Sequence, residues 1–177
     1  MGLLLVNKKL WKVPEAFVLS PFYGKGAEIT ISNDVDFVQG DLFHYDIRLA
    51  LNCANNTEQP WDNLQTLILK VKNLWLNEGL PTLTQCFHER NRNKARPYML
   101  YYLSLYIQTM IWLQERPVYT LNAIQEQLNH LPYAPMNIRE RISFILNSPD
   151  HYHSFITLKQ LFEESHKKWT IYLMKKN

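Results

Sequence analysis

The chain has 177 residues, of which 46% are hydrophobic, 13% aromatic and 20% charged, and 5 are glycines. This composition predicts one folded domain with a sizeable core, and it argues against a disordered chain and against glycine-rich phosphate-binding loops. The formal net charge of +3 permits an anionic partner without indicating one. The two cysteines, Cys53 and Cys86, have no metal-binding spacing and are typical of a reducing compartment.

The first third of the chain has the weakest pattern. Residues 1–55 are predicted to form an irregular segment packed on a helical domain of residues 56–177. The apolar run in "MGLLLVNKKLWKV" is too short for a signal peptide, so a cytoplasmic location is expected. Pro14 suits the start of a short helix, whereas "AEITISNDVDF" has β-branched residues but no clear partner strand. A helix is expected from Asp41, with one face formed by Leu42, Tyr45, Leu49 and Cys53.

The middle of the chain has strong helical periodicity. Apolar residues recur three and four positions apart from Trp61 to Asn77, which predicts a helix that Gly79 ends. A shorter helix is expected up to about Asn91, and another after the proline at position 117. Between them, "PYMLYYLSLYIQTMIWL" is shorter than the roughly 20 residues of a membrane span, so it predicts a buried central helix that begins at Pro97.

The C-terminal third predicts two further helices. Asn137 followed by Glu140 has the spacing of a capping box at the start of the first. The second is expected from about Ser154 to Met174, with a continuous apolar side. The predicted fold is therefore an all-α, single-domain bundle of about five to seven helices with an irregular N-terminal segment.

Two histidines, His151 and His153, lie in the turn between these last two helices. They are weak candidates for metal ligands, with Glu163, Glu164 and His166 available to complete a coordination shell. The spacing matches no established metal signature. The alternative is a helix–helix turn in which Tyr152 packs and the imidazoles bond to helix ends.

A second candidate site is the basic segment "RNRNKAR". Its four cations are predicted to lie in a loop between two helices, where they could bind phosphate groups while the tyrosines that follow stack on bases. The alternative is a solvated helix connection whose cations favour the C-terminal end of the preceding helix. The candidate anion-binding or nucleic-acid-binding residues are Arg90, Arg92, Lys94 and Arg96.

Catalysis has little support in the sequence. No serine lies in a nucleophile elbow, and Cys86 and His88 would point to different sides of a helix. Arg139 and Arg141 flank Glu140 and are expected on a solvated or ion-paired face, with a partner-binding patch as the alternative. The chain is therefore predicted to be non-enzymatic and to need no cofactor.

The stretch "MNIRERISFILNSPDHYHSFITLKQLFEESHKKW" resembles the C-terminal signature of the YpoC-like proteins, small helical proteins of Gram-positive bacteria. The resemblance extends over about residues 60–177, including "CFHER" and "IWLQERPV". It implies a helical bacterial protein and implies no activity. It draws attention to the positions that match the signature, namely Glu140, Arg141, Tyr152, His153 and Ser154.

A protein-interaction or adaptor module is the function that these observations favour, with another protein as the partner. The first alternative is an accessory nucleic-acid-binding protein that uses the basic segment from Arg90 to Arg96. The second alternative is a metal-binding protein at His151 and His153. The sequence does not indicate an oligomeric state.

Overall fold

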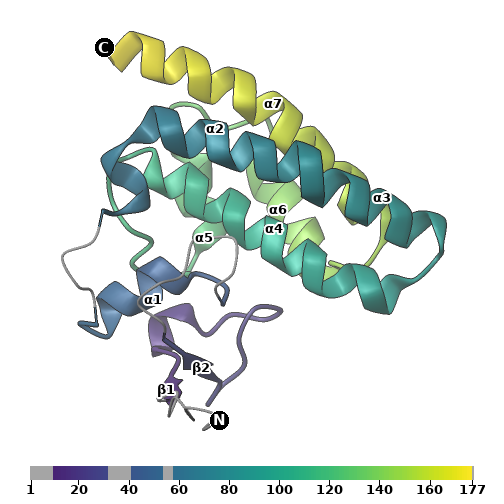
Figure 1. Cartoon of the computed structure of the whole chain (residues 1–177), viewed down its shortest axis with the longest axis horizontal. Coiled ribbons are helices and arrows are strands. Elements are labelled where there is room, and N and C mark those ends of the chain that lie inside the picture. The colour runs from purple at the N-terminus through teal and green to yellow at the C-terminus, as the bar shows by residue number, and fades with distance from the viewer. Residues whose placement is uncertain (1–9, 32–40, 54–57, 177) are drawn as a thin grey trace, which may run out of the picture.

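The computed structural model describes residues 10–31, 41–53 and 58–176. Helices dominate these residues, and the sheet they contain has only two short strands, which confirms the predicted all-α class. Figure 1 shows a body of long helices with a smaller N-terminal layer packed beneath one end of it. Among the described helices, none is long and apolar enough to cross a bilayer.

The N-terminal layer contains a hairpin-like pair that the sequence did not reveal. Strand β1 (Leu10–Lys12) runs antiparallel to β2 (Glu28–Thr30), with Trp11 opposite Ile29. A short 3-10 helix, η1 (Glu15–Phe17), lies between them. Strands of three residues are too short for a clear alternating pattern, so the partner of the second strand was not recognisable. The expectations for residues 1–9, 32–40 and 54–57 lie outside the described residues.

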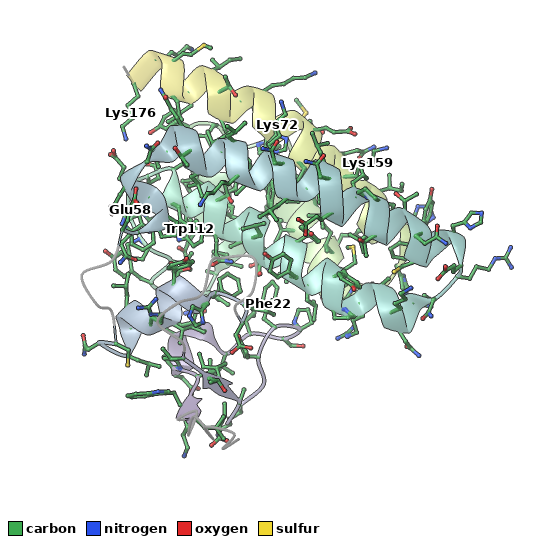
Figure 2. The ribbon with its side chains drawn as sticks, viewed as in Figure 1. Phe22, Glu58, Lys72, Trp112, Lys159 and Lys176 are labelled. Carbon is green, nitrogen blue, oxygen red and sulfur yellow. The ribbon has the colours of Figure 1, made fainter. Side chains whose placement is uncertain are left out.

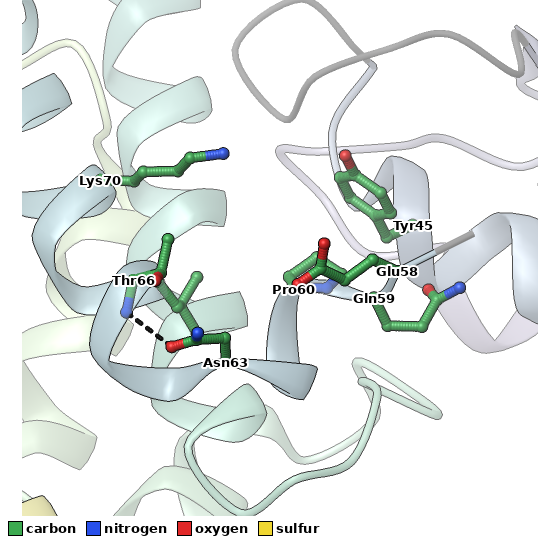
Figure 3. Close-up of a pocket in the computed structure, with 8 residues that line it drawn as sticks. Tyr45, Glu58, Gln59, Pro60, Asn63, Thr66 and Lys70 are labelled. Carbon is green, nitrogen blue, oxygen red and sulfur yellow. Dashed lines mark hydrogen bonds between the residues drawn. The ribbon is translucent and has the colours of Figure 1, made fainter.

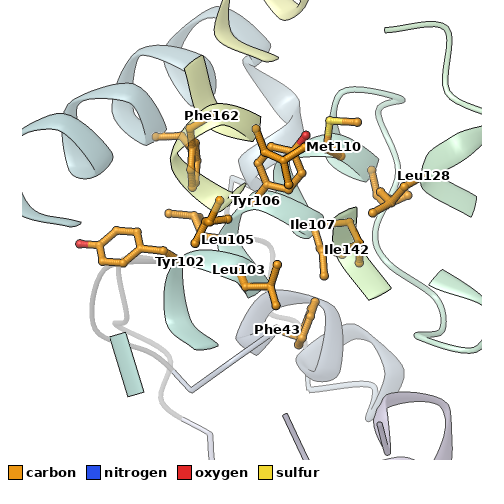
Figure 4. Close-up of a cluster of buried hydrophobic side chains, with 14 of the residues drawn as sticks. Phe43, Tyr102, Leu103, Leu105, Tyr106, Ile107, Met110, Leu128, Ile142 and Phe162 are labelled. Atoms are coloured by element: carbon orange, nitrogen blue, oxygen red, sulfur yellow. The ribbon is translucent and has the colours of Figure 1, made fainter. Parts of the chain in front are cut away.

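Helix α1 (His44–Ala50) buries a different face from the predicted one. The predicted stripe through Tyr45 and Leu49 is only half-buried, whereas Phe43 and Ile47 are fully buried. Phe43 precedes the helix with a left-handed backbone (φ 57°), and Figure 4 shows its ring next to Leu103 of the central helix. The prediction was wrong because Phe43 and Ile47, four residues apart, share the face that meets the core.

The predicted break at Gly79 does not occur. Helix α2 (Leu64–Leu74), preceded by a 3-10 turn, η2 (Pro60–Asp62), passes through a π-helical turn, η3 (Trp75–Gly79), directly into α3 (Leu80–His88). Gly79 has ordinary helical dihedral angles (φ −64°). A Cβ atom there would lie 2.6 Å from the ring of Tyr102. The glycine therefore permits a close approach of two helices and does not cap one.

The central helix, α4 (Arg92–Trp112), begins five residues before the predicted start at Pro97. Asn91 caps it, since the Asn91 side chain accepts a hydrogen bond from the backbone N–H of Lys94 at 3.0 Å. A proline in the second turn lacks one helical N–H, and this helix tolerates that loss. From position 102 to position 112 every residue of α4 is buried, as expected for a helix surrounded by others (Figure 4).

Three helices complete the bundle: α5 (Ile124–Asn129), α6 (Ile138–Asn147) and α7 (Tyr152–Lys176). The predicted capping box is wrong, because Asn137 has a left-handed backbone (φ 56°) and its side chain makes no capping hydrogen bond. The 25-residue helix α7 packs against α2, α4 and α6. Trp75 stacks on Phe162 of α7, with ring centroids 4.3 Å apart.

A buried carboxyl group joins the N-terminal layer to the bundle. Asp46 of α1 is fully buried, and its Oδ1 accepts hydrogen bonds from Trp112 Nε1 at 3.0 Å and from the Val118 backbone N–H at 2.6 Å. Burial raises the pKa of Asp46 to about 7, although these two hydrogen bonds oppose the rise. The layer is thus attached through a group that holds its proton at mildly acid pH.

Candidate functional site

The structure brings the two candidate segments of the sequence to one end of the bundle. Arg92 Nη2 lies 2.9 Å from Asp150 Oδ2 in the turn between α6 and α7, and Arg92 Nε donates to the same oxygen at 3.1 Å. Arg96 Nη1 lies 3.9 Å from Asp150 Oδ1. We call this surface the basic end, defined as residues 87–96 together with residues 150–153.

Most of the basic segment is helical, and the predicted loop placement was wrong. Arg90 has a left-handed backbone (φ 54°) and links the helices, whereas Arg92, Lys94 and Arg96 lie on the first turns of α4. Their side chains are about half exposed. Lys94 Nζ lies 3.6 Å from Glu89 Oε2. The hydrogen bond from the Gln85 side chain and the positive charge of Lys94 lower the pKa of Glu89.

The histidine turn is organised by a hydroxyl group. Ser154 is buried, and its Oγ donates to the Ser148 carbonyl at 2.6 Å, which closes the turn before α7. Tyr152 is 56% exposed and meets the ring edge of Phe87 at a centroid distance of 5.9 Å. Phe87 in turn stacks on Phe155 at 5.2 Å. The ring of Tyr152 is therefore held against a packed aromatic pair.

The residues proposed as a metal coordination shell do not lie together in the fold. His151 and His153 are exposed, and the described residues contain no group of three or more histidine, cysteine, aspartate or glutamate side chains that could hold a metal ion. His166 lies about 20 Å further along α7, given a rise of 1.5 Å per residue. It is partly buried beside Trp169, and burial lowers its pKa to about 4.

Arg141 joins α6 to α7. Its Nη1 and Nη2 donate to the two carboxylate oxygens of Glu164 at 2.9 and 3.0 Å, and the Arg141 side chain is only 17% exposed. Arg139 faces another way and pairs with Glu126 at 2.8 Å, with more than half of its side chain exposed. Glu140 is exposed. Arg141 thus has a packing role in this fold.

Replacing Arg141 with methionine is expected to lower the free energy of unfolding by about 1 kcal/mol, because a bidentate ion pair with a largely buried guanidinium is lost. Arg139→Met provides the matched control, since its exposed pair should contribute less than about 0.5 kcal/mol. Urea denaturation of both variants measures the difference. Equal losses in the two variants would contradict the packing role of Arg141.

A second surface lies at the opposite end of α7. Ile171 and Met174 are 53% and 72% exposed, although both are large apolar side chains. An open hollow of about 240 Å³ lies on one side of them and another of about 250 Å³ on the other. We call this surface the C-terminal ridge. Its hollows are lined by Gln65, Ile68, Thr170, Leu173 and Met174, and by Pro132, Tyr133, Lys168, Ile171, Tyr172 and Lys175.

The sequence contained a sign of this ridge, namely two apolar residues outside the predicted apolar side of the last helix. The predicted apolar side of the last helix runs through Trp169 and Leu173, which are buried. Ile171 and Met174 fall off that stripe, so two apolar residues were left for the solvent face of an amphipathic helix. Apolar residues outside the buried stripe indicate a surface worth testing for contacts.

A third hollow, drawn in Figure 3, lies between α1 and α2. Its walls carry Glu58, Thr66 and Lys70. Its volume of about 140 Å³ is below the roughly 300–1,000 Å³ usual for small-molecule sites. The amide oxygen of Asn63 on its wall already accepts from the Thr66 backbone N–H as a helix cap. The hollow therefore has little capacity for a substrate.

A family model described as YpoC-like protein matches residues 65–177. The chain belongs to the YpoC-like family. The uncharacterized protein YpoC of Bacillus subtilis is 26% identical over 113 residues, which cover 64% of this chain and 68% of that protein. No solved structure matches. The YpoC-like region contains α2 through α7 almost entirely, and thus both the basic end and the C-terminal ridge.

Proposed function

We propose that this YpoC-like chain is a non-enzymatic protein-interaction module, and that its C-terminal ridge is the surface that contacts the partner. The observation that carries the proposal is the exposure of Ile171 and Met174 between two hollows at the end of a well-packed helix. Burying large apolar side chains contributes about 25 cal/mol for each Å² removed from water. A partner that covers the ridge would gain this free energy.

The charges around the ridge indicate the chemistry of the partner. Lys168 and Lys175 line one hollow, and Lys176 pairs with Glu115 at the end of α7. Figure 2 shows Lys72 beside α7 and Lys176 at its C-terminal end. Docking two copies of the ridge on one another would bring like charges together, which is unfavourable. The ridge therefore suits an apolar surface that is flanked by carboxylates on a different protein.

Site-specific photocrosslinking in cells of the native host tests this function. A photoreactive phenylalanine at position 174 is expected to yield one dominant crosslinked species, whereas the same group at position 144 is expected to yield none. Phe144 is a suitable control because it is an exposed apolar residue of α6, outside the ridge. With the photoreactive group kept at position 174, Ile171→Glu should abolish the crosslinked species, while Phe144→Glu should leave it unchanged.

Both glutamate variants must retain the helical circular-dichroism spectrum and a cooperative unfolding transition. Equal crosslinking at positions 174 and 144 would contradict a specific ridge contact. A crosslinked species made of two copies of this chain would show instead that the ridge self-associates, against the charge argument. Crosslinking from position 174 that persists in Ile171→Glu would contradict the apolar contact at the ridge.

A further inference from the structure

The basic end is assembled from two parts of the chain that lie about sixty residues apart. Asp150 accepts from Arg92 and also approaches Arg96, so one carboxylate holds two guanidinium groups at the N-terminal turns of α4. Both arginine side chains remain about half exposed while they are held in this way. A guanidinium that is already oriented loses less conformational entropy when it binds an anion.

Positive charge remains in excess at this surface after the ion pairs are counted. The cations are Arg90, Arg92, Lys94 and Arg96, and the carboxylates that pair with them are Glu89 and Asp150, so four positive charges face two negative ones. Cations on the first turn of a helix also oppose the helix dipole, which favours anions there. An anionic ligand would relieve both the charge excess and the dipole conflict.

An exposed aromatic ring belongs to the same turn as the aspartate that pairs with these arginines. Tyr152 is two residues from Asp150, and its ring is supported at the edge by Phe87, which is itself stacked on Phe155. More than half of Tyr152 faces solvent. A supported, exposed ring on the same surface as guanidinium groups matches the way in which proteins hold unpaired bases, because the base stacks while its phosphates meet the cations.

We propose that the basic end binds single-stranded nucleic acid, with the phosphates on Arg90, Arg92 and Lys94 and a base stacked on Tyr152. A duplex hides the faces of its bases, so the aromatic ring favours the unpaired form. The site is independent of the C-terminal ridge, because the two lie at opposite ends of α7, with Tyr152 about 30 Å along the helix from Ile171 and Met174 (Figure 1). A molecule with both sites could join a protein to a nucleic acid.

Fluorescence anisotropy with the full chain and a labelled 20-nucleotide single-stranded DNA of mixed sequence tests the proposal. Two to three phosphate contacts predict that affinity falls on the order of tenfold between 50 and 200 mM salt. Tyr152→Ala is expected to weaken binding roughly tenfold without changing the salt dependence, since stacking releases no counterions. The double variant Arg90→Ser and Lys94→Ser is expected to weaken binding and to flatten the salt dependence.

Arg139→Ser is the matched control, because Arg139 is an exposed, ion-paired arginine of α6 outside the basic end. It should bind as the unsubstituted chain does. Absence of binding at 50 mM salt overturns the proposal, and so does an equal loss of affinity in Arg139→Ser. Tighter binding to a duplex of the same sequence would contradict stacking of a base on Tyr152. Displacement of the labelled DNA by 10 mM inorganic phosphate at constant ionic strength would assign the site to free phosphate instead.

Discussion

Replacing Asp46 with asparagine is expected to make the protein more stable than the unsubstituted chain by on the order of 1–3 kcal/mol above pH 7. In the folded state Asp46 is fully buried, and burial raises its pKa to about 7, against about 3.9 in an unfolded chain. Each unit of that difference corresponds to about 1.4 kcal/mol. Asparagine keeps an oxygen that accepts from Trp112 and Val118 and carries no charge. Its NH2 group takes the place of Oδ2, which is buried without a hydrogen-bond partner among the residues that the structure describes, and this offsets about 1–3 kcal/mol of the gain.

The sign of the pH dependence follows from the raised pKa. Below about pH 4 both states of the chain hold the proton of Asp46, and the stabilising effect of holding it in the fold is fully present. As the pH rises from about 4 to 7 the unfolded chain ionises first, so the stability of the unsubstituted protein falls relative to Asp46→Asn. Above about pH 7 the difference between the two proteins becomes constant.

Urea unfolding of both proteins at several pH values between 4.5 and 8.5 measures this difference. His166 has a lowered pKa of about 4, so it adds stability that is lost as the pH falls below about 6.5, which opposes the slope due to Asp46. His166 is present in both proteins and cancels in the difference. Glu163→Gln, at an exposed carboxylate of α7, is the control for the loss of one negative charge at the surface. A constant difference between the Asp46→Asn variant and the unsubstituted chain would contradict a raised pKa.

Replacing Gly79 with alanine is expected to destabilise the fold by about 1–3 kcal/mol. An alanine Cβ would lie 2.6–2.8 Å from three ring carbons of Tyr102, closer than carbon atoms approach. Overpacking of a core by one carbon typically has this cost. The sign is the informative part, since glycine to alanine inside an unobstructed helix stabilises by about 1 kcal/mol.

Two further variants separate the steric effect from helix propensity. Gly24→Ala places its Cβ in open space, so it should change the free energy of unfolding by less than about 0.5 kcal/mol. In a Tyr102→Leu background the ring is gone, and Gly79→Ala should then be neutral or stabilising. Chemical denaturation of the unsubstituted chain, Gly79→Ala, Tyr102→Leu and the double variant gives the coupling energy between the two positions. If Gly79→Ala stabilises the unsubstituted chain, the close approach of the two helices is wrong.

The helical bundle was predictable because its signal is local. A helix such as α6 or α7 presents apolar residues every three or four positions, and this repeat can be read without knowing what covers it. The central helix was recognisable for a related reason, since a stretch that is apolar on all sides must be surrounded. The family signature in the last third of the chain agreed with the same elements, and the family match over residues 65–177 confirms it.

Errors arose where a usual signal was overridden, in one case by a residue far along the chain and in two cases by residues close by. Gly79 is a usual helix terminator, yet here it serves a contact with Tyr102, which lies 23 positions later. Pro97 is a usual helix start, yet the Asn91 side chain caps the helix earlier. The face of α1 was misjudged because Phe43 precedes the helix with a left-handed backbone. Local preferences are worth about 1 kcal/mol, and tertiary contacts override them.

The sequence by itself determined the class of fold, the order of the helices from α2 onwards and the chemical character of both basic and histidine-bearing segments. The tertiary structure alone decided that these two segments form one surface, because an ion pair between Arg92 and Asp150 has no counterpart in local periodicity. It also decided which apolar residues remain exposed. The sequence places Ile171 and Met174 outside the apolar stripe of the last helix, but only the packing of α7 on the bundle establishes that they face solvent.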